Sequence, residues 1–266
     1  MVRNPAVSGQ FYPANKGSLL DDLENMIPDR SDKIDAVGAI VPHAGYIYSG
    51  PVAGEVYARL KPRSTYIILS PNHTGYGARF ASWSEPWRTP LGVVDVDRDL
   101  LAAMMQETGL VTEDPAAHAF EHSIEVQLPF IQKTSPAGKI VPMTIQYGNL
   151  SEYQEVADAI VSAAKRAARD VVILASSDMT HYESRKSAKE KDQKAIRAVL
   201  ALDAEGLLDV VEKNNISMCG YIPAAIMLMC AKKMNAKKAE LVRYSDSGDV
   251  TGDITQVVGY AGIIVY

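Results

Sequence analysis

The hydrophobic positions of the chain fall into short, nearly continuous runs that are rich in Val and Ile. Runs this short and this apolar are typical of strands buried on both faces, as in a sheet that helices cover on each side. They predict strands at residues 36–41, 66–70, 140–145, 171–175 and 257–265.

Between these runs, the apolar residues recur at helical spacing. Residues 18–27 carry Leu and Ile on one stripe, and residues 156–164 repeat that pattern after Ser151, which we expect to cap the helix. Pro223 is expected at the first position of a later helix, because a missing N–H costs nothing there. Further helices are expected over 184–202, 204–212 and 224–234.

Strands that alternate with helices predict an α/β fold, here an α/β/α sandwich. Residues 87–97 differ from the rest, since TPLG between short Val-rich stretches indicates a hairpin or an edge insertion. The polar stretch 28–35 is a loop candidate that is too short to separate domains. We therefore expect one domain over residues 1–266.

The composition, with 47% hydrophobic and 22% charged residues, is that of a globular protein. Lys and Arg total 27 against 32 Asp and Glu, and a net charge of -5 disfavours a nucleic-acid partner. Two Cys cannot form a disulfide framework, and the first residues lack the apolar core of a signal peptide. The apolar stretch 219–231 is too short to span a bilayer. We expect a cytoplasmic protein without a membrane partner.

Polar, metal-capable side chains follow three of the predicted strands. His43 comes directly after the first strand, His73 after the second, and Asp178 with His181 after the fourth. A single histidine is more often structural, but ligands of open α/β sheets bind at the carboxyl ends of the strands. The sequence therefore predicts a polar pocket at this edge of the sheet, in which Asp178 orients the His181 imidazole or lines the same cleft. The glycines of PHAGYIYSGPVAG are expected to allow close backbone approach around it.

The segment HAFEH, from His118 to His122, matches the H-x-x-E-H pattern of inverted zinc peptidases. That reading requires a helix that carries both imidazoles on one face, and Pro115 and Pro129 leave room only for a short one. We expect instead that His122 faces the same pocket as His43, while His118 lies outside it.

The two cysteines have different surroundings. Cys219 precedes a predicted helix, whose dipole would favour the thiolate and so metal binding or nucleophilic reactivity. Cys230 lies within the apolar helix and is expected to be inert.

Six motifs taken together resemble the Memo family, and they cover nearly the whole chain in order: VSGQFYP, VPHAGYIYSG, SPNHTGYG, EHSIEVQLPF, SSDMTHY and MCGYIPAAI. The resemblance implies a fold like that of the class III extradiol ring-cleaving dioxygenases, with a non-haem iron site. It also implies that His43, His73 and Cys219 are metal ligands, with Asp178, His181 and His122 as the candidate catalytic groups. A Cys in place of the usual carboxylate favours softer metals, so iron or copper is expected and zinc is an alternative.

Two functions follow from this resemblance. The first is a metal-dependent oxidoreductase or metal-handling protein, and the second is a non-catalytic module that recognises a peptide or a small anionic ligand. Microbial members are called AmmeMemoRadiSam system protein B, which implies association with radical-SAM and AMMECR-like proteins. In animal members the resemblance suggests binding of phosphotyrosine peptides.

Overall fold

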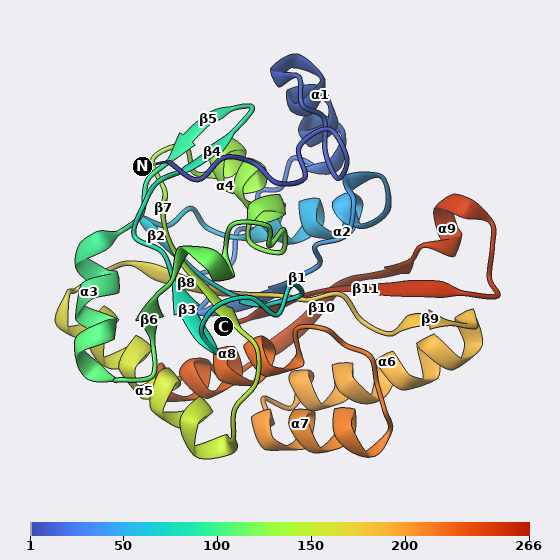
Figure 1. Cartoon of the computed structure of the whole chain (residues 1–266). Coiled ribbons are helices and arrows are strands. Elements are labelled where there is room, and N and C mark those ends of the chain that lie inside the picture. The colour runs from blue at the N-terminus through green and yellow to red at the C-terminus, as the bar shows by residue number, and fades with distance from the viewer. Residues whose placement is uncertain (1) are drawn as a thin grey trace.

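The computed structural model describes residues 2–266 and is built around one large mixed sheet. Its strands lie in the order β10-β11-β1-β8-β2-β7-β3-β6, and β9 pairs with β11 (Figure 1). The strands are β1 (Gly38–Val41), β2 (Thr65–Pro71), β3 (Phe80–Ser82), β6 (Thr112–Glu113), β7 (Lys139–Ile145), β8 (Val171–Ser176), β9 (His181–Glu183), β10 (Ala239–Asp246) and β11 (Val257–Val265).

The centre of this sheet is parallel, while its flanks are antiparallel. Strands β1, β8, β2 and β7 run side by side in one direction, and β11 and β3 pair against the two outer members of this group. All four central strands are apolar and almost entirely buried, as the continuous hydrophobic runs predict. Their carboxyl ends meet at one edge of the sheet, where the loops that carry His43, His73 and Asp178 begin.

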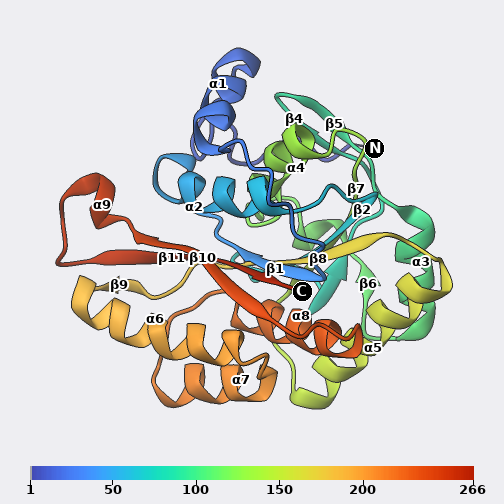
Figure 2. The same cartoon turned by 180° about the vertical axis from the view of Figure 1, so that it is seen from behind.

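Helices cover both faces of the sheet, which confirms the predicted α/β fold. In Figures 1 and 2, α1, α2 and α4 lie on one face, and α5 to α8 lie on the other. The helices are α1 (Lys16–Met26), α2 (Tyr46–Arg59), α3 (Arg98–Glu107), α4 (Leu128–Thr134), α5 (Leu150–Arg166), α6 (Arg185–Leu200), α7 (Ala204–Lys213), α8 (Tyr221–Lys233) and α9 (Gly248–Thr251), with short 3-10 turns η1 (Pro115–Ala117) and η2 (Glu125–Gln127).

Helix α8 is apolar on every side because it packs between the sheet and the neighbouring helices α5 and α7. It begins at Tyr221, so Pro223 is its third residue and not its first. The expected cap of α5 is also wrong. Asn149 caps that helix by accepting from the Glu152 amide, and the Glu152 side chain accepts from the Asn149 amide in return.

The glycine-rich segment after His43 forms most of helix α2, which the sequence pattern did not predict. Gly50 and Gly54 lie one helical turn apart and pack against Met26 of α1. A Cβ atom on Gly54 would come within 2.0 Å of the Met26 carbonyl oxygen. These two glycines therefore serve helix packing and not the pocket.

The expected hairpin is confirmed, since β4 (Trp87–Thr89) pairs antiparallel with β5 (Gly92–Val94). Among the described residues, no helix has both the length and the apolar character needed to cross a membrane.

Candidate metal centre

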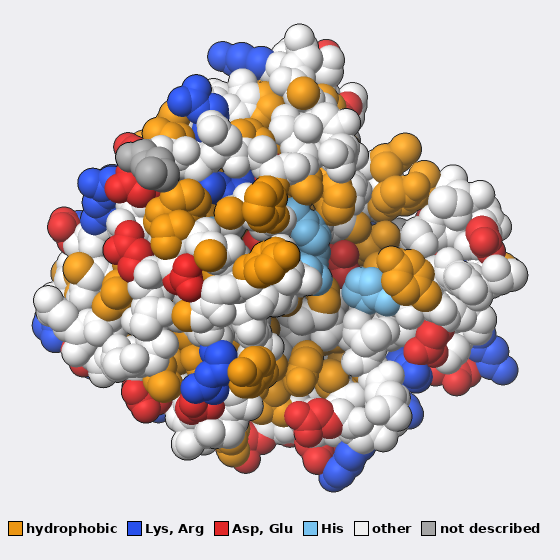
Figure 3. Space-filling model, viewed as in Figure 1, with side chains coloured by type: hydrophobic (Ala, Val, Ile, Leu, Met, Phe, Trp, Pro, Cys, Tyr) orange, Lys and Arg blue, Asp and Glu red, His pale blue; other side chains and the backbone are white. Residues whose placement is uncertain are grey.

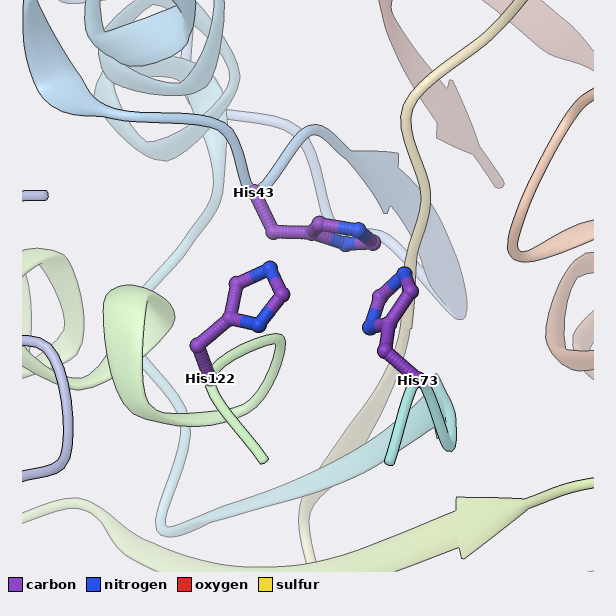
Figure 4. A group of neighbouring side chains, drawn as sticks. All are labelled: His43, His73 and His122. Atoms are coloured by element: carbon purple, nitrogen blue, oxygen red, sulfur yellow. The ribbon is translucent and has the colours of Figure 1, made fainter. Parts of the chain in front are cut away.

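Three histidines from different parts of the chain meet at the carboxyl edge of the parallel strands. His43 follows β1, His73 follows β2, and His122 lies in the irregular segment between η1 and η2. Their rings face one another (Figure 4), and one nitrogen of each lies within 4.8 Å of the other two. The ring centroids are 4.7 to 5.5 Å apart. His43 is buried, whereas His73 is the most exposed of the three.

Hydrogen bonds around Ser176 determine which nitrogen of His43 carries the proton. The Ser176 hydroxyl donates to the Ser123 carbonyl oxygen at 2.7 Å, and it also accepts from the Gln127 amide. Ser176 can therefore only accept from His43 Nδ1, which lies 2.9 Å away. Burial and the neighbouring His73 and His122 hold the pKa of His43 well below its usual value. The ring is neutral, and its Nε2 accepts from the Cys219 thiol at 3.3 Å, so a metal ion that binds this nitrogen would displace the thiol proton.

Glu121 holds His73 from two sides. Its carboxylate accepts from the His73 backbone amide at 2.5 Å and lies 2.9 Å from His73 Nδ1. Burial opposes ionisation of both partners. The mutual hydrogen bond and charge outweigh it, so that the pKa of His73 is raised and that of Glu121 is lowered. A histidine whose Nδ1 is bound to a carboxylate and whose Nε2 is open is the usual form of a metal-ligating histidine.

His122 completes the three-histidine cluster. Its backbone amide donates to Glu121 at 2.9 Å, and its ring packs against Phe11, with centroids 4.8 Å apart. Burial lowers the pKa of His122 to about 4, although the charge of Glu121 acts in the opposite direction. This imidazole is also neutral at pH 7.

Cys219 lies beside His43, with its Sγ 3.3 Å from His43 Nε2. A nitrogen and a sulfur at this separation match neighbouring ligands of one metal ion, for which bond lengths are about 2.0 and 2.3 Å. Burial and the nearby charge of Asp178 raise the pKa of the Cys219 thiol. The expectation that the dipole of α8 would favour the thiolate is therefore wrong for the protein without a bound cation.

Asp178 and His181 reach the same edge of the sheet, but neither holds the other. The Asp178 carboxylate accepts from the backbone amide of His43 at 2.8 Å, and burial raises its pKa to about 6. His181 Nδ1 lies 2.8 Å from the carbonyl oxygen of Ser217, which can only accept, so Nδ1 carries a proton. Asp178 thus fixes the loop of His43, and His181 presents its Nε2 separately.

His118 lies apart from the three-histidine cluster. It is fully buried beside Trp87, and its Nε2 donates to the Ala81 carbonyl oxygen at 3.2 Å. Burial lowers the pKa of His118 to about 4. His118 and His122 share no helix, which rules out the joint chelation that the peptidase reading requires.

The sequence patterns missed the groups that hold the histidines in place, chiefly Glu121 and Ser176. Both stand inside motifs that drew attention for other residues, Glu121 in HAFEH and Ser176 in SSDMTHY. Hydrophobic periodicity predicts helices and strands, but it does not indicate which distant residue will form a hydrogen bond with a given side chain. The HxxEH match did place a glutamate next to His122, and this was the one signal available.

The N-terminal segment supports the loop that carries His122. The buried Arg3 guanidinium forms an ion pair with Glu125 and donates to the carbonyl oxygens of His118 and Glu121. It also lies over the ring of Trp87, 4.3 Å from the ring centroid. Arg3 therefore replaces the regular hydrogen bonds that this irregular segment lacks.

Comparison with known proteins agrees with the motif resemblance. A family model described as Memo-like protein matches residues 3–264. A MEMO1 family protein from Methanopyrus kandleri is 42% identical over 279 residues, which cover 99% of each chain. One from Methanosarcina acetivorans is 43% identical over 266 residues, again covering 99% of each chain. One from Methanocaldococcus jannaschii is 39% identical over 283 residues, with the same coverage.

The fold also resembles a solved structure of much lower sequence similarity. The crystal structure of an uncharacterized protein from Escherichia coli K12 aligns with a TM-score of 0.58 and 11% identity. The alignment covers 85% of this chain and 98% of that one, so it supports a common fold and nothing finer. The match to the family model and the full-length relatives settle the assignment: this chain belongs to the Memo-like protein family.

Proposed function

We propose that this protein binds a transition-metal ion between His43, His73 and His122, with Cys219 as the neighbouring donor. The observation that carries the proposal is the convergence of the three imidazoles, one nitrogen of each lying within 4.8 Å of the other two. His43 and His73 each use Nδ1 in a hydrogen bond and leave Nε2 toward the cluster, and His43 and His122 are neutral. Neutral imidazoles held by second hydrogen bonds are what metal ligation needs.

The donor set narrows the choice of metal. Imidazole nitrogen and thiol sulfur suit iron, copper and zinc, whereas magnesium and calcium prefer oxygen ligands. An iron or copper ion would supply redox chemistry, and the family resemblance to class III extradiol dioxygenases favours an oxidoreductase of that type. The same resemblance implies His43, His73 and Cys219 as the ligands. The experiment must therefore determine whether His122 or Cys219 is the third ligand.

The remaining groups of the pocket have roles that follow from their contacts. Asp178 positions His43 by accepting from its backbone amide. His181 directs its Nδ1 proton to Ser217, which leaves Nε2 to accept a proton from a bound molecule. We propose Asp178 and His181 as the pair that completes the catalytic pocket. The partners implied by the family, a radical-SAM protein and an AMMECR-like protein, belong to the same proposal.

Anaerobic calorimetric titration with Fe(II), Cu(I) and Zn(II) tests the metal site. We expect His43→Ala and His73→Ala to abolish tight binding. His122→Ala and Cys219→Ser then report which of the two donors binds the ion, and Cys230→Ser serves as the matched control for the thiol. Cys230 is buried within α8, away from the three histidines, so its variant should bind metal as the parent does.

Two outcomes would contradict the proposal. If the parent protein binds none of the three metals, the cleft is better explained as a non-catalytic module for a peptide or small ligand. If His43→Ala and His73→Ala bind as tightly as the parent, the metal lies elsewhere in the chain.

A further inference from the structure

A cavity of about 270 Å³ opens next to the metal centre and reaches two of its residues, His73 and Cys219. It lies between the carboxyl ends of β2 and β7 and the beginning of α8. Figure 3 shows the histidines in a hollow of this face with hydrophobic side chains around them. Its lining also includes Tyr147, Tyr153, Tyr221, Ile222 and Glu212.

The walls of this cavity combine three tyrosine side chains with polar groups, and polar and apolar atoms line it in about equal share. Tyr147 is 60% exposed at its rim, whereas Tyr153 and Ile222 are buried in its wall. Burial of apolar surface is the main source of affinity in ligand sites, and a cavity of this size is at the small end of their range. It therefore suits a ligand of about ten non-hydrogen atoms that carries both a flat aromatic ring and a polar group.

The cavity has few charged groups, and the His73 imidazole in its wall is balanced by the buried Glu121 carboxylate. Glu212 is its one carboxylate, and no Lys or Arg lies among its lining residues. Glu212 forms no ion pair with any residue of the part of the chain that the structure describes. Arg79 lies over the ring of Tyr147, 5.4 Å from the ring centroid, but its guanidinium is paired with Glu152. This arrangement attracts a cation and repels an anion.

We propose that the cavity binds a small arylalkylamine, with its ring among the tyrosines and its ammonium group toward Glu212. The ammonium gains both from the carboxylate and from the faces of the tyrosine rings. The opposite end of such a molecule reaches the side of the cavity formed by His73 and Cys219. The inference that an arylalkylamine is the substrate rests on the proposed metal function. The inference that the cavity binds such an amine does not depend on it.

Three probes of similar size separate shape from charge: 2-phenylethylamine, 2-phenylethanol and 3-phenylpropionate. Titration of the metal-free protein should give the amine the tightest binding and the carboxylate the weakest, whereas a metal ion bound at His73 would add a positive charge to the cavity wall and reduce this difference. A partly exposed carboxylate is worth a few-fold in affinity, so we expect about tenfold between the amine and the acid.

Three variants test whether the preference for the amine arises in this cavity. Glu212→Gln should bring the amine and the alcohol to the same affinity. The matched control Glu190→Gln removes the same charge from the exposed face of α6 and should leave the preference for the amine intact. Tyr147→Ala should weaken all three probes, because it removes apolar contact and no charge.

The inference is overturned if the acid binds as tightly as the amine, if Glu212→Gln leaves the ranking unchanged, or if none of the probes binds at millimolar concentration. These results are independent of the metal titration. Amine binding to a protein that takes up no metal would support the cavity and reject the proposed function, and the reverse pattern would do the opposite.

Discussion

The two sides of the metal centre are built differently. On the side of the N-terminal segment, Arg3, Glu125 and Glu121 are buried and joined by hydrogen bonds and one ion pair. On the side of the cavity, Tyr147 and Glu212 are exposed, and neither belongs to a buried network. The first side holds the imidazoles, and the second leaves room for a ligand.

The two sides should contribute differently to the free energy of unfolding. A buried charge is tolerated only when it is paired and hydrogen-bonded, so the network of Arg3 fixes the position of the His122 loop closely. An exposed wall costs little to alter, which suits a surface that determines the choice of ligand. Changes on the two sides should therefore differ in stability, in metal affinity and in ligand affinity.

The largest effect is expected from Arg3→Met. The variant leaves Glu125 buried without its cation, and removal of one partner from such a pair lowers the free energy of unfolding by about 3–5 kcal/mol. Urea unfolding of the metal-free protein measures this loss. The double variant Arg3→Met/Glu125→Gln should recover part of it, because no unpaired charge remains. A loss below about 1 kcal/mol in the single variant would mean that the pair does not support this wall.

His118, on the same side, should make stability depend on pH. Its folded pKa of about 4 lies below the ordinary value of 6.5, so the unfolded chain binds a proton that the folded chain does not. The neutral His118 therefore contributes fully to the free energy of unfolding above pH 6.5, and this contribution is lost as the pH falls toward 4. The shift corresponds to about 3 kcal/mol.

Urea unfolding of the parent and of His118→Gln at pH 7.0 and 4.5 tests this dependence, since the difference between the two proteins removes the other titrating groups. The parent should lose more stability than the variant on acidification. Equal losses in both proteins would show that His118 takes up its proton in the folded state.

Glu121→Gln should act mainly on metal binding. Loss of the carboxylate that holds His73 typically costs 10- to 100-fold in metal affinity, or about 1.4–2.7 kcal/mol. Calorimetry with Zn(II) measures the change, and Glu113→Gln, at an exposed carboxylate of β6, is the matched control. Unchanged affinity in Glu121→Gln would place His73 outside the ligand set.

The smallest effect on stability is expected for Tyr147→Ala on the cavity side. Because this side chain is 60% exposed, its truncation should change the free energy of unfolding by less than about 0.5 kcal/mol. Thermal unfolding measures this, and a much larger loss would show that the cavity wall is as rigid as the N-terminal one.

Much of the fold can be predicted from the sequence. The continuous apolar runs of β1, β2, β7, β8 and β11 can be satisfied only by burial on both faces, so they predict a covered sheet. His43 and His73 come directly after two of these runs. Because the strands pair in parallel, both residues lie at the same edge of the sheet. Helix α2 escaped prediction because its glycines, which favour turns locally, pack against Met26 of a helix distant in sequence.

The sequence by itself determined the α/β class, the family and the strand-end positions of His43, His73 and Asp178, because each depends on local patterns or motifs. The sequence also predicted that His122 faces the pocket of His43, and the structure brings the two together. Only the tertiary structure decided that Glu121 and Ser176 orient the rings of the cluster and that Arg3 supports the loop of His122. Their hydrogen bonds link residues up to 133 positions apart, and no local propensity encodes such a pairing. They form because buried polar groups must find partners, and the fold determines which partners lie within reach.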